Sequence, residues 1–163
     1  MRHTAKLVVV ATTILASVSA LFAPTSVVAA PSLASQQASV VLLDHMSMAA
    51  FQTARNAHDP SWMDWSSDGC STPLPVGLGD TGRSYNFRKA CERHDFGYRN
   101  EKRLDRASGK AGTYWNSTTR KRVDVQFLAD MRADCAPRPI TQRYTCRAWA
   151  GVYYDAVRTA GGP

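Results

Sequence analysis

Beyond about residue 30 the sequence contains no apolar run long enough to cross a bilayer, so it predicts no retained membrane span. It contains no C-x-x-C pair and no second histidine close to its cysteines, which argues against a zinc site. It also has no internal repeat and no convincing strand pattern. These absences leave a small domain built from helices.

Residues 1–30 have the layout of a secretory signal peptide. A basic start, MRHTAK, precedes a soft apolar run, LVVVATTILASVSALFA, which is followed by small residues, PTSVVAA. The run contains several hydroxyl side chains and has no basic flank at its far end, which favours cleavage over a retained anchor. We expect cleavage near Ala30 and a secreted protein, in which residues 31–38 form a flexible N-terminus or a short propeptide.

Residues 31–163 are enough for one compact domain with a modest core. The whole chain carries a net charge of +7, and the loss of Arg2 and Lys6 with the signal would still leave it basic. A basic secreted protein is attracted to anionic surfaces, which include nucleic acid, acidic polysaccharide and anionic lipid. Charge alone does not select among them.

All four cysteines lie in the expected mature part. An even number in an exported chain predicts disulfides, and four cysteines permit three pairings. We favour the sequential pairing, Cys70 with Cys91 and Cys135 with Cys146. A bridge that closes a loop of roughly twenty residues typically stabilises a fold by about 3 kcal/mol.

Four segments have helical patterns, and a loop rich in glycine and proline (residues 59–84) separates the first from the second. The second follows Ser84, a plausible N-cap, and contains YNFRKACERHDFGYRNEKRL. We therefore predict an all-α fold, a small disulfide-linked helical bundle in which two antiparallel helices carry the functional residues. The other three predicted helices cover residues 35–57, about 116 or 117 to 135, and about 140–159.

His94 and Asp95 lie on the inward face of the second predicted helix, and Asp124 leads the inward face of the third. If these helices pack antiparallel, His94 faces Asp124. A carboxylate that holds one ring N–H stabilises the imidazolium and makes a histidine a general base. Because no serine or cysteine is evidently available as a nucleophile, such a base would activate water. The spacing alone leaves open a structural core histidine.

Asp95 lies about 100° around the helix from His94 and must make different contacts. The first disulfide would bring Asp68 and the Gly69 carbonyl alongside Asp95. Two carboxylates and a backbone carbonyl are hard oxygen ligands, which suit calcium. Spacing alone also allows Asp68 to be a simple turn residue.

The strings DWSSDGC, CERHDFGYRN and RVDVQFLADM resemble the secreted phospholipase A2 enzymes of bacteria and fungi. The similarity runs from about Trp62 to Val157 and includes WAGVYYDAV, whereas the glycine-rich calcium loop and paired cysteines of the animal enzymes are absent. The resemblance implies hydrolysis of the sn-2 ester to a lysophospholipid and a free fatty acid by a monomer at glycerophospholipid membranes or micelles. It implies His94 as base, Asp124 as its partner, and Asp68, Gly69 and Asp95 as calcium ligands.

The alternative is a non-catalytic basic protein that binds lipid surfaces on the same scaffold. It would keep the disulfides and the basic stretch STTRKRVD, but it would not need His94, Asp124 and two calcium aspartates together. A small secreted nuclease would also fit the charge. We predict no nucleic-acid partner, because no second histidine or lysine lies on an inward face to protonate a leaving group.

Overall fold

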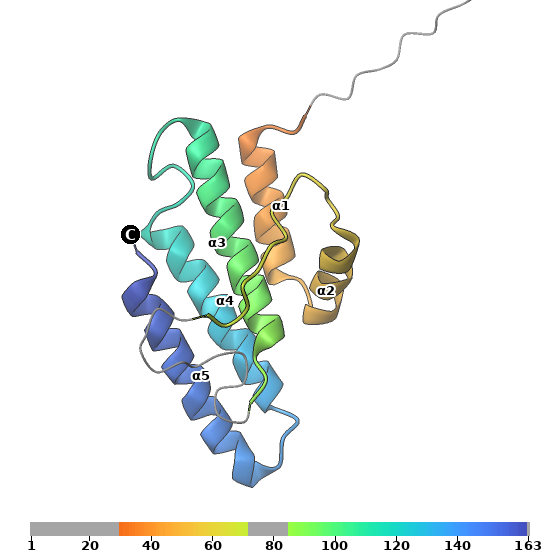
Figure 1. Ribbon diagram of the computed structural model, residues 1–163, viewed down its shortest axis with the longest axis vertical. Helices are drawn as coiled ribbons and strands as arrows, with labels where there is room; N and C mark the ends of the chain where they lie inside the picture. The colour runs from red at the N-terminus through yellow and green to blue at the C-terminus, as the bar shows by residue number, and fades with distance from the viewer. Residues whose placement is uncertain (1–29, 72–84, 163) are drawn as a thin grey trace, which may run out of the picture. The chain divides into compact units, whose positions relative to one another are not determined.

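Helices account for all the regular structure in the described part of the chain. The computed structural model describes residues 30–71 and 85–162, which form five α-helices and no strand (Figure 1). The all-α fold expected from the sequence is therefore confirmed. No helix in these ranges is both long enough and apolar enough to cross a membrane. The helices are α1 (Leu33–His45), α2 (Met48–Ala57), α3 (Arg88–Ser108), α4 (Ser117–Cys135) and α5 (Ile140–Ala160).

The first predicted helix is two helices, so the expectation of one helix over residues 35–57 is wrong. Met46 is extended, and the Ser47 hydroxyl accepts a hydrogen bond from the Ala50 N–H and starts α2. The buried Arg93 guanidinium of α3 donates to the carbonyls of Asp44 and Met46, at 3.0 and 2.9 Å. A tertiary contact therefore satisfies the carbonyls that the break releases.

The start of α4 and the end of α3 have recognisable caps. Asn116 and Thr119 form a capping box at the start of α4, and Gly109 ends α3 in the left-handed region at φ 69°. Ser84, the expected cap of α3, lies outside the described residues. The helix starts at Arg88, whose N–H donates to the Asn86 side chain.

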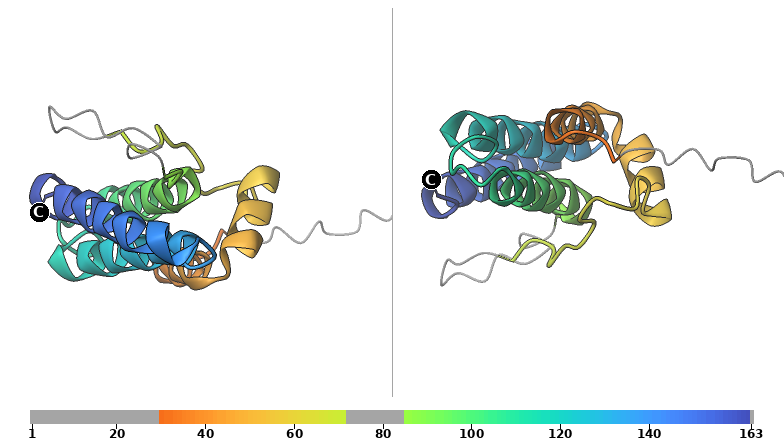
Figure 2. Two further views of the ribbon diagram at one scale, coloured as in Figure 1. Left: turned by 90° about the horizontal axis from the view of Figure 1, so that it is seen from below. Right: turned by 90° about the horizontal axis from the view of Figure 1, so that it is seen from above.

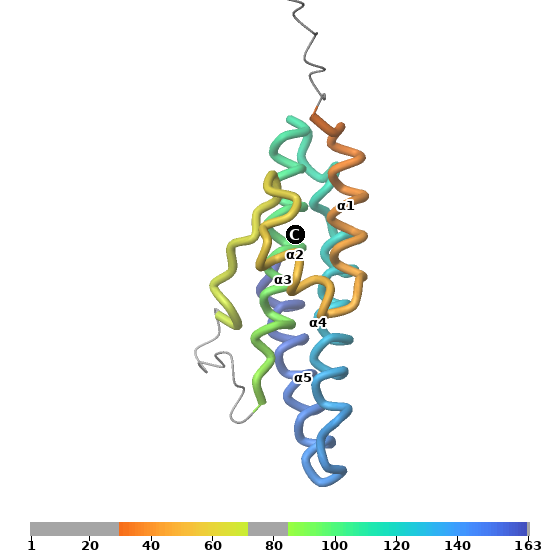
Figure 3. Tube along the Cα trace, turned by 90° about the vertical axis from the view of Figure 1, so that its right-hand side faces the viewer, coloured from red at the N-terminus to blue at the C-terminus, as the bar shows by residue number. Residues whose placement is uncertain are grey.

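The helices α3, α4 and α5 pack side by side in alternating directions, and α1 packs against α3 and α4 (Figures 2 and 3). Gly97 allows the close approach of α3 and α4. A Cβ atom at this position would lie 2.7 Å from Cγ1 of Val123, which is nearer than real Cβ contacts. His94 and Asp124, which were singled out from the sequence, lie next to this contact.

Two disulfides connect the helices to their neighbours. Cys70–Cys91 joins the segment that precedes α3 in the chain to α3 itself, and Cys135–Cys146 joins the end of α4 to α5. This is the sequential pairing favoured from the sequence. All four sulfur-bearing side chains are buried in the apolar core shared by α3, α4 and α5.

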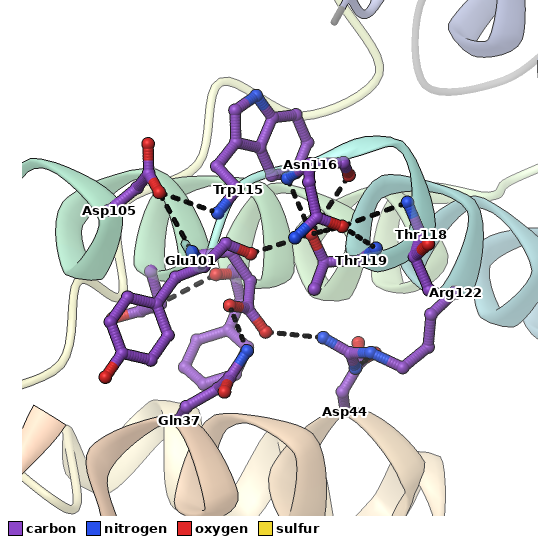
Figure 4. A network of polar contacts seen from close by, with 12 residues as sticks. Gln37, Asp44, Glu101, Asp105, Trp115, Asn116, Thr118, Thr119 and Arg122 are labelled. Atoms are coloured by element: carbon purple, nitrogen blue, oxygen red, sulfur yellow. Dashed lines mark hydrogen bonds and ion pairs between the residues drawn. The ribbon is translucent and has the colours of Figure 1, made fainter. Parts of the chain in front are cut away.

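A buried polar network fastens α1 to α3 and α4. Arg122 of α4 donates to Asp44 of α1 at 2.8 Å and to Glu101 of α3 at 2.6 Å, and Gln37 of α1 also donates to Glu101 (Figure 4). Asp44 and Glu101 are fully buried. One guanidinium therefore serves two carboxylates from different helices.

Candidate active site

His94 and Asp124 meet across the contact between α3 and α4. The distance from His94 Nε2 to Asp124 Oδ1 is 2.9 Å, and Asp124 is fully buried. The imidazole ring contacts the rings of Tyr98 and Phe127, whose centroids are 4.2 and 4.7 Å away. The structure thus places the predicted pair in direct contact.

Asp124 is held by three further groups besides His94. The Tyr98 hydroxyl donates to Oδ1 at 2.7 Å, and Arg158 of α5 donates to Oδ2 at 2.7 Å. The Arg120 Nε lies 3.7 Å from Oδ2. Burial opposes ionisation, but the hydrogen bonds from His94, Arg158 and Tyr98 outweigh it and hold the pKa of Asp124 below its usual range.

The charge on Asp124 determines which histidine nitrogen carries the proton. An ionised carboxylate can only accept, so Nε2 must carry the hydrogen that points at Asp124. The other ring nitrogen, Nδ1, has no hydrogen-bond partner in the described part of the chain. His94 also lines a cavity of about 90 Å³. The cavity is bounded by Gly69, Cys70, Ser71, Cys91, His94, Asp95, Phe127, Tyr153 and Val157.

Asp95 is directed toward the segment that carries Asp68 and Gly69. Its Oδ2 accepts from the Ser67 hydroxyl at 2.6 Å and from the Asp68 N–H at 3.1 Å. Burial raises the pKa of Asp95 to about 6, the Ser67 hydrogen bond opposes the rise, and the Asp68 carboxylate adds to it. The Cys70–Cys91 disulfide holds this segment against α3, as expected.

Asp68 has a more exposed carboxylate, with 60% of its side chain accessible. It accepts from Ser71 at 2.7 Å and from Arg99 at 2.9 Å. The Ser71 hydrogen bond is the main reason that the pKa of Asp68 lies below its usual range, although partial burial opposes it. The Asp68 side chain is therefore ion-paired with a neighbour in α3.

Asp68, Asp95 and the backbone carbonyl of Gly69 have the ligand chemistry that suits an oxygen-binding cation. No three His, Cys, Asp or Glu side chains within the described ranges cluster closely enough to hold a metal ion. The expected set has only two carboxylates, and its third ligand is the Gly69 carbonyl. However, the carboxylates of Asp68 and Asp95 repel each other. A cation bound by both carboxylates would relieve this repulsion. Gly69, at φ 72°, lines the cavity beside Asp95.

A family model for prokaryotic phospholipase A2 matches residues 41–161, which include all the site residues above. The chain belongs to this phospholipase A2 family. A secretory phospholipase A2 of Arthroderma benhamiae is 40% identical over 123 residues, which cover 74% of each chain. A secretory phospholipase A2 of Beauveria bassiana is 36% identical over 112 residues, or 69% of this chain and 51% of the relative. The family and the enzyme class expected from the sequence are confirmed.

Several site residues of this phospholipase A2 family member were not identified from the sequence. Arg158 was not singled out, and Arg120 appeared only as part of a basic stretch. Ser67 lies in a serine-rich turn, where nothing marks it as a partner of Asp95. The spacing of Arg158 from Asp124 carries no signal, because the contact depends on how α5 packs against α4.

Proposed function

We propose that the protein is a secreted, calcium-dependent phospholipase A2 that hydrolyses the sn-2 ester of glycerophospholipids, acting as a monomer. The observation that supports this most directly is the buried hydrogen bond from His94 to Asp124, which leaves Nδ1 as the nitrogen that can accept a proton beside the cavity. The names of the two fungal relatives support secretion. The expected signal peptide lies outside the described residues.

In the proposed reaction, His94 Nδ1 removes a proton from water as the water oxygen bonds to the ester carbonyl carbon. Asp124 stabilises the imidazolium that forms and keeps the ring in one tautomer. The imidazolium then returns the proton to the sn-2 oxygen as the bond between that oxygen and the acyl carbon breaks. The products are a lysophospholipid and a fatty acid.

Asp68, Asp95 and the Gly69 carbonyl would hold calcium in this proposal. Bound calcium would supply positive charge to the substrate phosphate and to the ester carbonyl oxygen. The chain's own contribution is to position the ligands: Ser67 orients Asp95, and the Cys70–Cys91 disulfide keeps Asp68 and Gly69 beside it. Arg99 neutralises Asp68 in the structure, so it must release or share that carboxylate when a cation binds.

Chelation is expected to abolish the activity. Fatty-acid release from phosphatidylcholine vesicles should fall by about 100-fold or more in chelator, since a cation that polarises a carbonyl contributes several kcal/mol. Calcium should restore the activity and magnesium should not, because magnesium demands a strict octahedral shell and holds its waters tightly. Undiminished release in chelator would contradict the calcium proposal.

A second readout separates calcium binding from catalysis. In the absence of substrate, calcium should raise the melting temperature of the protein, since a ligand that binds only the folded state stabilises that state. Asp95→Asn should remove this shift, while Asp64→Asn should keep it, because among the described residues the Asp64 side chain accepts hydrogen bonds from Ser66 alone. An equal shift in both variants would place the ion elsewhere.

Arg158 is proposed as a positioning residue that acts through Asp124. We expect Arg158→Gln to lower kcat about tenfold with little change in KM, because Asp124 loses a charged hydrogen bond. Arg158→Lys should retain most of the activity, since an ammonium can still pair with Oδ2. Steady-state kinetics on dispersed short-chain phosphatidylcholine would measure both variants. Equal losses in the two would argue for a purely structural role.

A further inference from the structure

The outward side of α5 carries an apolar stripe that no described element covers. Ile140, Tyr144, Ala148 and Val152 follow one another at intervals of four residues and lie within about 120° around the helix axis. Ile140 is 75% exposed, Tyr144 83% and Val152 43%, and Ala148 is also exposed. We name these four residues the α5 outer face. Such a face is the reverse of what a surface helix normally presents to water.

Arginines lie along one side of the α5 outer face. The sequence from Ala136 to Tyr154 contains Arg138, Arg143 and Arg147 and no acidic residue, and the first acid of α5 is the exposed Asp155, which follows Val152 by three residues. Arg147 lines a surface depression together with Arg132 of α4. Arg138 faces Asp134 of α4 and is partly neutralised. Arg132, Arg143 and Arg147 form no ion pair with any residue in the described ranges.

Exposed apolar side chains elsewhere do not form a comparable surface. In the described part of the chain, α1 exposes Leu42 and α4 exposes Val125 as the only other large ones. Single exposed apolar residues are ordinary on a protein surface. The neighbours of Leu42 along α1, including Val40 and Leu43, are buried in the core. In the described part of the chain, α1 therefore presents little exposed apolar surface.

We propose that the α5 outer face docks onto the surface of anionic phospholipid bilayers. Apolar side chains that enter the headgroup region, flanked by arginines that meet the phosphates, are the combination that binds a helix flat to such a surface. The proposal rests on the proposed function, because a phospholipase must reach its substrate in a lipid aggregate. It adds which face of the protein makes that contact and which lipid charge favours it.

The α5 outer face and the cavity lie on opposite sides of the same helix. Val152 is next in the chain to Tyr153, which lines the cavity from the inward side of α5, as does Val157. A helix with its side chains is about 10–12 Å across. Docking through α5 would therefore hold the cavity containing His94 within about one helix diameter of the headgroups.

Vesicle binding by matched variants tests the proposal. His94→Ala serves as the common background, so that the lipid is not consumed during the measurement. In this background Tyr144→Asp should weaken sedimentation with phosphatidylglycerol vesicles by about tenfold, since it places an anion on the docking face. Arg147→Glu should weaken it less, with an effect that salt reduces. Leu42→Asp, which alters an apolar residue on α1 that is 67% exposed, should bind as the background does.

Hydrolysis with His94 intact gives the second arm. Tyr144→Asp should lose about tenfold on phosphatidylglycerol vesicles and keep the wild-type rate on dispersed short-chain phospholipid. Equal vesicle binding by Tyr144→Asp and Leu42→Asp would overturn the docking proposal, as would a wild-type dimer that Tyr144→Asp dissociates. If the protein binds vesicles through α5 but hydrolyses no phospholipid, the docking proposal is supported and the proposed function is contradicted. The melting temperature of each variant shows that it is folded.

Discussion

Replacement of His94 by alanine is expected to lower phospholipid hydrolysis by about 10³- to 10⁴-fold while the protein stays folded. The imidazole is the group beside the cavity whose free nitrogen can accept the proton of an attacking water. Its removal leaves Asp124 bonded to Tyr98 and Arg158, so the buried carboxylate keeps partners. Fatty-acid release from vesicles and the melting temperature would measure the two effects separately.

A second histidine provides the control for this prediction. His58 ends α2 with a left-handed backbone at φ 52° and lies in an exposed turn. His58→Asn should keep near wild-type activity, because asparagine tolerates that conformation. Imidazole added to the His94→Ala variant should restore part of the lost rate, since the missing base can then diffuse into the space. Near-normal turnover by His94→Ala would refute its role as base.

The free energy of unfolding is expected to decrease by about 3 kcal/mol between pH 4 and pH 7 through a single buried carboxyl, Asp44. Burial raises the pKa of Asp44 from 3.8 to about 7, although Arg122 and Arg93 oppose the rise. The folded protein therefore holds a proton that the unfolded chain releases near pH 4. The resulting stability is fully present below that pH and is lost as the pH rises to about 7.

The groups around Asp44 come from both helices that pack against α1. Arg93 and Glu101 face it from α3, and Arg122 and Asp130 face it from α4. Asp44→Asn cannot titrate, so its unfolding free energy should lack the Asp44 part of the pH dependence. Urea unfolding of both proteins at several pH values would measure the difference. Parallel curves for the two proteins would show that Asp44 is ionised throughout this range.

Local sequence signals predicted the helices around the site better than those far from it. The bounds of α4 and α5 follow from clear apolar spacing, and α4 starts after Asn116, as expected from the sequence. The break between α1 and α2 was missed although Ser47 offers a cap, because no glycine or proline marks it. Its cause is Arg93, a residue of another helix that takes up the released carbonyls.

The same distinction holds at the site. His94 and Asp124 could be paired from the sequence because both lie on inward faces of helices joined by a short loop. Arg158 could not, since its contact with Asp124 depends on the packing of α5 against α4. Asp68 was correctly placed near Asp95, but its ion pair with Arg99 was not foreseen. Charge partners across helices depend on rotation and offset, which no local pattern encodes.

The missing side chain of Gly97 governs how closely His94 and Asp124 can approach each other. Val123 is fully buried and branched at Cβ, so it cannot swing aside for a methyl group on the opposing helix. The backbones of α3 and α4 would have to separate instead. His94 is three residues from Gly97 and Asp124 is next to Val123, so this separation would move the imidazole away from the carboxylate. The separation of His94 and Asp124 thus depends on the lack of a Cβ atom at residue 97, because the space between α3 and α4 cannot hold one.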